Sequence, residues 1–224
     1  MTRGVWLALC LVAGCAAAED ANVGGDRDLA VGTAPDDMTS DTPDDLARSG
    51  GEGGVIPPVS CAGGLHVVIN EVKVGSAASG SDEFIELYNP CANTVDLTGS
   101  TLVYRSAAGT VDVMPVIANL NKTIAAGGYY LVVGSAYSNG GTPDQMYGTG
   151  RLAAAGGGVG LRDGAQVLVD SVGYGTATNA FVEGAAAAAP PNGQSIARTP
   201  NGTDKNNNAT DFAVATTPTP RAAN

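Results

Sequence analysis

Apolar and polar positions divide the chain into three stretches with different patterns. The first stretch begins Met1-Thr2-Arg3, and its residues 5–13 form a nine-residue apolar run. Residues 16–60 contain ten acidic and two basic side chains and no aromatic residue. Residues 61–224 carry short segments rich in β-branched and aromatic residues, separated by Gly, Asn, Asp or Pro. The pattern predicts a leader, a polar linker and one β-rich domain.

Several segments of the third stretch have the composition of β-strands. In residues 83–89, Phe84, Glu86 and Tyr88 share one face, and the residues between them share the other. Residues 162–165 predict a tight hairpin, whereas the glycine run at 156–160 is predicted to be a flexible loop that enters a strand. This spacing favours an all-β fold, an antiparallel β-sandwich. The predicted strands cover residues 66–74, 83–89, 101–105, 129–133, 159–162 and 166–174.

Charge and composition exclude several classes of function. The 224 residues carry a formal net charge of −11 at pH 7 and include 32 Gly. The acidic excess argues against a nucleic-acid partner, and the glycine content disfavours a helical bundle. His66 is the single histidine, so one chain cannot build a zinc site from two or three imidazoles. We expect His66 to be an ordinary residue at the start of a strand.

The apolar run at the N-terminus predicts export. It is too short to span a membrane and has the length of a signal-peptide core. The sequence that follows, Val12-Ala13-Gly14-Cys15, resembles the lipobox of bacterial lipoproteins. That resemblance implies a signal peptide at 1–14, cleavage between Gly14 and Cys15, and lipid on Cys15. An ordinary cleavage site at residues 16–18 is the alternative, and it would discard Cys15.

The linker that follows is predicted to be disordered. Residues 16–60 have a net charge of −8, and few apolar side chains offset the entropy lost on ordering. We therefore expect residues 15–60 to form a lipidated, acidic tether. A calcium-binding or partner-binding acidic tail is the alternative.

Two cysteines remain in the predicted domain. Cys61 precedes the first predicted strand, and Cys91 follows the second. If these strands form a hairpin, both cysteines lie near the same end, and disulfides persist in exported proteins. We expect a Cys61–Cys91 disulfide, with two free thiols as the alternative.

Several motifs of the third stretch resemble the lamin tail domain family. Residues 69–72 read Ile-Asn-Glu-Val, residues 82–89 read Asp-Glu-Phe-Ile-Glu-Leu-Tyr-Asn, and residues 95–99 read Val-Asp-Leu-Thr-Gly. Arg198, Asp211 and residues 218–220 resemble the C-terminal tail of exported bacterial members. The resemblance implies an immunoglobulin-like β-sandwich with an extended C-terminal tail over residues 61–224.

Acidic residues near the first two strands are candidates for chemistry. Glu71, Asp82, Glu83 and Glu86 form the densest acidic group of the domain, and Glu71 and Glu86 could face each other across the hairpin. Paired carboxylates bind hard cations or act as general acids and bases. The alternative is that these acids satisfy backbone amides or pair with Lys73 and Arg105.

A second weak metal candidate lies near the C-terminus. Asp204, Asn206 and Asn208 have the spacing of the first three ligands in a calcium loop. Ala209 replaces the turn glycine, however, and Ala215 stands where the twelfth-position glutamate belongs. Arg198 and Asp211 could instead pair and fix the tail.

We expect this chain not to be an enzyme and to need no cofactor. It would be a lipid-anchored protein of the bacterial outer membrane, facing the periplasm or the cell surface. Its partner would be an envelope or extracellular protein or a glycan, bound for adhesion or scaffolding. The alternatives are a metal-dependent hydrolase using Glu71, Asp82 and Glu86, or an accessory targeting module for a secreted nuclease or phosphoesterase.

Overall fold

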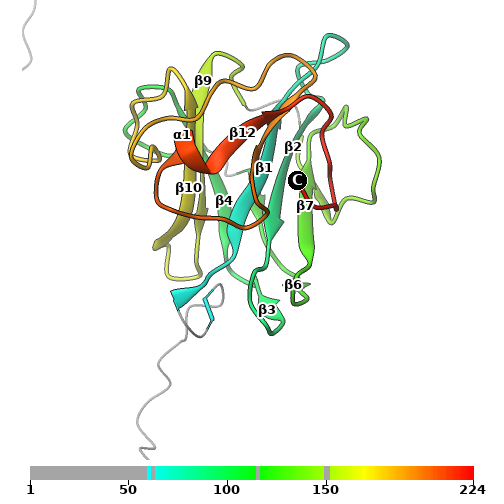
Figure 1. Ribbon diagram of the computed structural model, residues 1–224, viewed down its shortest axis with the longest axis vertical. Helices are drawn as coiled ribbons and strands as arrows, with labels where there is room; N and C mark the ends of the chain where they lie inside the picture. The colour runs from blue at the N-terminus through cyan, green and yellow to red at the C-terminus, as the bar shows by residue number, and fades with distance from the viewer. Residues whose placement is uncertain (1–59, 62–63, 115–116, 149–151) are drawn as a thin grey trace, which may run out of the picture. The chain divides into compact units, whose positions relative to one another are not determined.

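The computed structural model describes residues 60–61, 64–114, 117–148 and 152–224 (Figure 1). The predicted signal peptide, the lipidation site at Cys15 and nearly all of the linker lie outside these residues. The described residues form strands and one short helix. No helix among these residues is long and apolar enough to cross a membrane. The elements are β1 (Val68–Val74), β2 (Glu83–Tyr88), β3 (Val95–Asp96), β4 (Thr101–Ser106), β5 (Ala118–Asn119), β6 (Thr123–Ile124), β7 (Tyr129–Val133), β8 (Gln145–Met146), β9 (Gly156–Arg162), β10 (Leu168–Gly175), β11 (Ser195–Arg198), α1 (Asn208–Asp211) and β12 (Phe212–Ala215).

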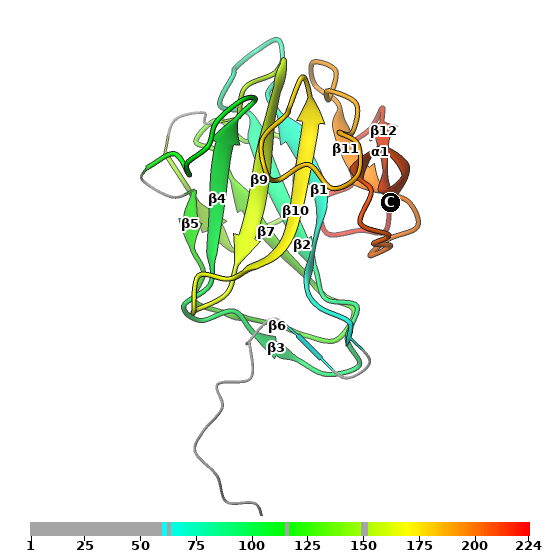
Figure 2. The same ribbon diagram turned by 90° about the vertical axis from the view of Figure 1, so that its left-hand side faces the viewer.

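Two sheets pack face to face. One has the strand order β12-β11-β1-β2-β7-β8, the other has the order β10-β9-β4-β5, and β3 pairs with β6. All pairings are antiparallel except that of β7 with β8. Figure 2 shows the sheet of β4, β9 and β10 lying over β1, β2 and β7. This arrangement confirms the predicted all-β, immunoglobulin-like sandwich.

Alternation along β1 and β2 decides which side chains enter the core. Val72 and Ile85 are cross-strand partners and belong to the main apolar cluster between the sheets. Phe84 points to the opposite face, where it forms a second buried cluster with Leu131 and Val133. Both faces of this sheet are therefore buried near β2. Consecutive residues of the strand point to opposite faces, and both sets are inaccessible to solvent.

The glycine run at 156–160 is a strand, and the prediction of a flexible loop there was wrong. Residues 156–162 form β9, which pairs with β4 on one side and β10 on the other. A Cβ at Gly157 would lie 2.4 Å from the Tyr104 hydroxyl oxygen, and one at Gly160 would lie 2.8 Å from the Phe181 ring. The glycines make room for these rings, so the strand lacks the alternating side chains that identify strands in a sequence.

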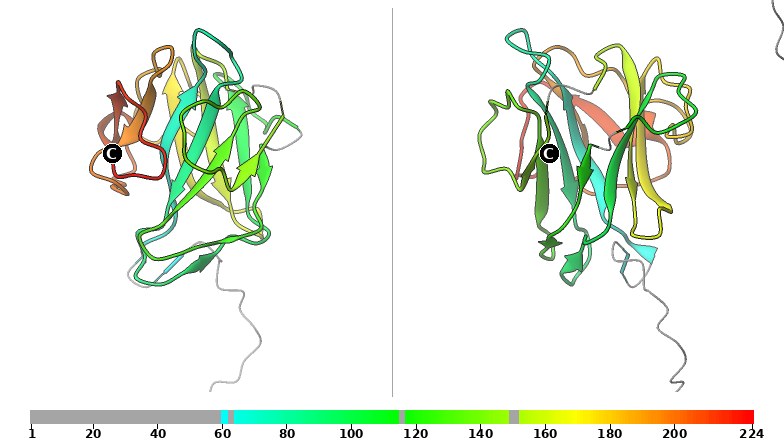
Figure 3. Two further views of the ribbon diagram at one scale, coloured as in Figure 1. Left: turned by 90° about the vertical axis from the view of Figure 1, so that its right-hand side faces the viewer. Right: turned by 180° about the vertical axis from the view of Figure 1, so that it is seen from behind.

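The C-terminal tail also contributes to the sheet. β11 pairs with β1, and β12 pairs with β11, so the tail adds two strands to the edge of β1. Figure 3 shows the C-terminal residues beside β1 and β2 on one side of the sandwich.

The predicted disulfide is present. Cys61 and Cys91 are bonded, with their Cα atoms 6.0 Å apart. The bond joins the segment before β1 to the segment after β2, and the antiparallel pairing of these strands confirms the predicted hairpin.

Candidate functional site

A fully buried arginine organises the most highly charged part of the domain. Arg198 ends β11, and its side chain is 0% exposed. Its Nη2 lies 2.8 Å from Asp170 Oδ1, and its Nη1 lies 3.2 Å from Asp204 Oδ1 and 3.5 Å from Asp211 Oδ2. The pairing of Arg198 with Asp211, expected as a way of fixing the tail, is confirmed. Contacts with several acceptors at once suit a planar guanidinium, which carries five N–H donors.

Arg198 also binds the backbone around it. Its Nε donates to the Ile69 carbonyl at 2.9 Å, and its Nη1 donates to the Thr203 carbonyl at 2.7 Å. The guanidinium carbon lies 4.7 Å from the centre of the Phe212 ring. One side chain thus connects β1, β10, β11, α1 and the loop between β11 and α1.

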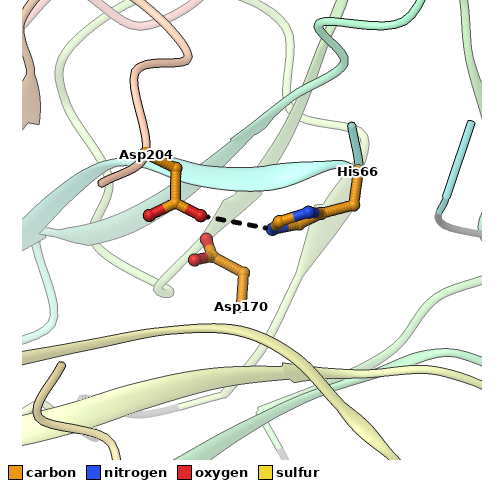
Figure 4. A group of neighbouring side chains, drawn as sticks. All are labelled: His66, Asp170 and Asp204. Carbon is orange, nitrogen blue, oxygen red and sulfur yellow. Dashed lines mark ion pairs between the residues drawn. The ribbon is translucent and has the colours of Figure 1, made fainter. Parts of the chain in front are cut away.

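His66 completes a cluster of possible metal ligands. Its Nε2 lies 3.5 Å from Asp204 Oδ2, and ligand atoms of His66, Asp170 and Asp204 all lie within 4.8 Å of one another (Figure 4). The Asp204 carboxylate raises the pKa of the imidazole, and His66 and Arg198 hold the pKa of Asp204 well below its usual range. The cluster therefore favours an ion pair between His66 and Asp204.

Part of the cluster lines a pocket. A pocket of about 190 Å³ is lined by Gly64, Leu65, His66, Asp204 and their neighbours. The His66 side chain is 25% exposed, whereas the Asp170 side chain is fully buried. His66 and Asp204 are thus the members that could offer ligand atoms to a divalent cation in the pocket. Asp170 is engaged by Arg198 and by the Ile69 N–H.

The predicted calcium-loop residues have separate partners. The Asn206 N–H donates to Asp204 Oδ1 at 3.0 Å, and the Asn206 side chain is exposed. Asn208 is buried, and its Oδ1 accepts hydrogen bonds from the Gly173 and Glu183 N–H groups, each at 2.9 Å. Asn208 therefore holds β10, while Asp204 faces Arg198 and His66.

Glu71 and Glu86 are cross-strand partners, as expected, and both are 0% exposed. Glu71 accepts hydrogen bonds from the Ser195 hydroxyl and from the Thr219 N–H. Glu86 accepts hydrogen bonds from the Arg221 N–H and the Asn70 side chain. Burial raises the pKa of Glu71, and burial together with the nearby Glu71 raises the pKa of Glu86 to about 7.

Two other acids of this group also have internal partners. Asp82 Oδ2 lies 2.8 Å from Lys73 Nζ, as expected. Glu83 points to the other face of the sheet and accepts hydrogen bonds from the Leu152 N–H and the Tyr147 hydroxyl. The expected pairing of Arg105 with this group was wrong, because Arg105 lies on β4 in the opposite sheet and pairs with Asp112 at 2.7 Å.

The lamin tail domain family matches residues 62–176 of the chain. The chain belongs to the lamin tail domain family. Members of this family have an immunoglobulin-like fold and are generally non-catalytic. A search of curated proteins found no match to the chain.

The charged cluster joins the matched lamin tail domain to the residues that follow it. His66 and Asp170 lie within residues 62–176, whereas Arg198, Asp204 and Asp211 lie beyond them. Glu71 and Glu86 also lie within the matched residues, and they accept hydrogen bonds from N–H groups of residues 219 and 221, which lie beyond them. Buried charges therefore dock the C-terminal segment on the lamin tail domain.

Sequence reasoning missed this role for His66 and Asp170. His66 lies two residues before β1, close to the predicted strand start, but its ion pair with Asp204 connects positions 138 residues apart. Asp170 gave one local signal, since it is the single charged residue of the predicted strand at residues 166–174. Its partner could not be inferred, because the pairing depends on β10 lying beside β1 in the opposite sheet.

Proposed function

We propose that this chain is a non-catalytic, lipid-anchored protein of the bacterial cell envelope that displays its lamin tail domain for binding, adhesion or scaffolding. One observation carries the non-catalytic part of the proposal: the carboxylates of the densest acidic group bind the framework of the domain. Glu71 and Glu86 accept backbone N–H groups of the C-terminal segment, and Asp82 pairs with Lys73. Buried carboxylates engaged in this way stabilise a fold.

The sequence before the domain supports the lipid anchor. Cys15 directly follows the small residues that close the apolar run. Each buried acyl CH₂ contributes about 0.8 kcal/mol to membrane binding, so several acyl chains anchor a protein without a spanning helix. Ala16 stands where an Asp would favour the inner membrane, which supports an outer-membrane location. The acidic residues 16–60 would separate the domain from that anchor.

Fractionation and crosslinking in intact producing cells test the display role. We expect the wild-type chain in the outer-membrane fraction, crosslinked to an envelope protein or glycan, and the Cys15→Ala chain in the soluble fraction without that product. A wild-type chain recovered in the soluble fraction, or an identical crosslinked product from Cys15→Ala, would contradict the proposal.

His66 and Asp204, which line the pocket, support a second candidate, a metal-dependent hydrolase. Metal analysis and phosphodiester hydrolysis by purified protein separate the two functions, with His66→Gln and Asp204→Asn as variants and Lys205→Gln as a nearby control. We expect no hydrolysis from any of the four proteins. Stoichiometric metal together with hydrolysis that both variants lose and the control retains would establish the hydrolase instead.

A further inference from the structure

A buried lysine lies on the outer face of the six-stranded sheet. Lys73 is 2% exposed, and its cross-strand partner on β2 is Phe84. Phe84 is buried with Leu131 and Val133, and the ring of Tyr137 meets it edge-on with ring centres 5.9 Å apart. The amine of Lys73 therefore lies beside an apolar wall, where a charged group is poorly solvated.

The amine has a carboxylate and a carboxamide as its two polar partners. Lys73 Nζ lies 2.8 Å from Asp82 Oδ2, and it also donates a hydrogen bond to Asn139 Oδ1. A C=O bond is about 1.2 Å long, so this hydrogen bond brings Nζ within roughly 4 Å of the carboxamide carbon, close to the distance of a near-attack arrangement.

The loop that carries Asn139 is held on both sides of that residue. The N–H and the hydroxyl of Ser138 donate to the two carboxylate oxygens of Asp82, each at 3.0 Å. The Tyr137 hydroxyl donates to the Gly140 carbonyl. Asp82 thus positions both the amine and the loop, which fixes the amine and the carboxamide in one geometry.

We propose that Lys73 and Asn139 form an intramolecular isopeptide bond, with Asp82 carrying the proton. The Lys73 ammonium gives one proton to Asp82, and the neutral amine then attacks Asn139 Cγ, whose carbonyl electrons move to Oδ1. A second proton passes from the attacking nitrogen to Nδ2, the Cγ–Nδ2 bond breaks, and ammonia leaves as the carbonyl re-forms. Asp82 returns its proton to the ammonia, so the products are an amide, an ammonium ion and the original carboxylate.

The contacts bring the three reacting groups together before any bond forms, with Lys73 paired to Asp82 and hydrogen-bonded to Asn139. Lys73 Nζ contacts the proton acceptor Asp82 and the carboxamide of Asn139 at the same time, so proton transfer and attack need no rearrangement of the chain. Lys73 is buried, and its hydrogen bond to Asn139 is partly buried. The product would join β1 to the loop between β7 and β8, across the intervening strand β2 and over a sequence separation of 66 residues.

Mass spectrometry of the full chain, after reduction of its disulfide, tests the bond. We expect a mass lower than the sequence mass by one ammonia, and a branched proteolytic peptide that contains Lys73 and Asn139. Lys73→Met and Asn139→Ala should restore the full mass of each variant and abolish the branched peptide, and Asp82→Asn should leave most of the protein unlinked. Lys122→Met, a change at an exposed lysine of the same domain, should retain the bond.

A competing reaction shares the loss of ammonia and must be distinguished. Asn139 precedes Gly140, and attack by the Gly140 nitrogen on Asn139 Cγ would give a cyclic imide. An ammonia loss that persists in Lys73→Met would assign it to that imide and overturn the proposal. A wild-type chain with its full sequence mass would overturn it as well, whether or not the variants fold.

Discussion

Buried charged residues in this sandwich have partners on several elements at once. Arg198 contacts three aspartates, two backbone carbonyls and the ring of Phe212. Removing one member of a buried ion pair costs more than the pair itself contributes, because the remaining charge is left unpaired in a region of low dielectric. Single substitutions of these buried charged residues should therefore have the largest effects on stability.

Arg198→Ala is expected to lower the free energy of unfolding by about 3–5 kcal/mol, because it leaves Asp170 buried without its cationic partner. Chemical denaturation measures this loss. Arg221→Ala is the matched control: Arg221 pairs with Asp144 but is 32% exposed, and we expect it to cost about 1 kcal/mol or less. Equal losses in the two variants would contradict the organising role of Arg198.

The raised pKa of Glu86 predicts that the stability of the domain falls as the pH rises towards neutrality. Its pKa in the folded state is about 7, above the ordinary value of 4.5, so the folded protein binds this proton more tightly than the unfolded chain does. The resulting stabilisation is complete below pH 4.5 and is lost as the pH rises through 7. Glu183, whose pKa burial also raises to about 7, acts in the same direction.

Urea denaturation between pH 4.5 and 8 should therefore show the wild-type domain losing stability as the pH rises. Glu86→Gln removes the titrating proton and should reduce that loss by up to about 3 kcal/mol, the equivalent of the shift in pKa. A wild-type stability that increases over this interval, or an unchanged slope in Glu86→Gln, would show that Glu86 titrates normally.

At the scale of elements, the C-terminal segment, residues 217–224, is bound to the six-stranded sheet by hydrogen bonds. Thr219 and Arg221 donate their N–H groups to Glu71 and Glu86, and Asn224 donates to the carbonyls of Asn70 and Arg198. These contacts cover a pair of carboxylates that the sheet would otherwise expose on its outer face.

Deleting residues 217–224 should destabilise the domain by about 3 kcal/mol or more, because hydrogen bonds to charged groups contribute about 1.5–3 kcal/mol each. Thermal and urea denaturation measure the loss. Asn224→Ala keeps the N–H donors of residues 219 and 221 and should cost less than about 1.5 kcal/mol. A truncated chain as stable as the full chain would show that the segment is dispensable for the fold.

The elements also show which parts of the structure the sequence could predict. β1, β2, β4, β7 and β10 were predicted because branched and aromatic side chains mark them, and the Cys61–Cys91 disulfide followed from the β1–β2 hairpin. β9 was missed in part because glycine has no side chain to alternate. The charged cluster was missed because His66, Asp170 and Arg198 come together only through the packing of different strands.

At the scale of the whole molecule, charge is unevenly distributed along the chain. Residues 16–60 carry a net charge of −8, whereas residues 61–224 carry only −4. The acidity of the chain therefore describes the predicted linker more than the lamin tail domain. A domain with a small net charge is suited to recognition through shape and local contacts rather than through a long-range field.

The proposed display of the lamin tail domain at the cell envelope depends on the lipid anchor. Mass spectrometry of the mature N-terminal peptide, from protein extracted from the membranes of producing cells, tests it most directly. We predict a peptide that begins at Cys15 and carries diacylglycerol, and the loss of that modification in Cys15→Ala. A peptide that begins at Glu19 without lipid would contradict the anchored, display role.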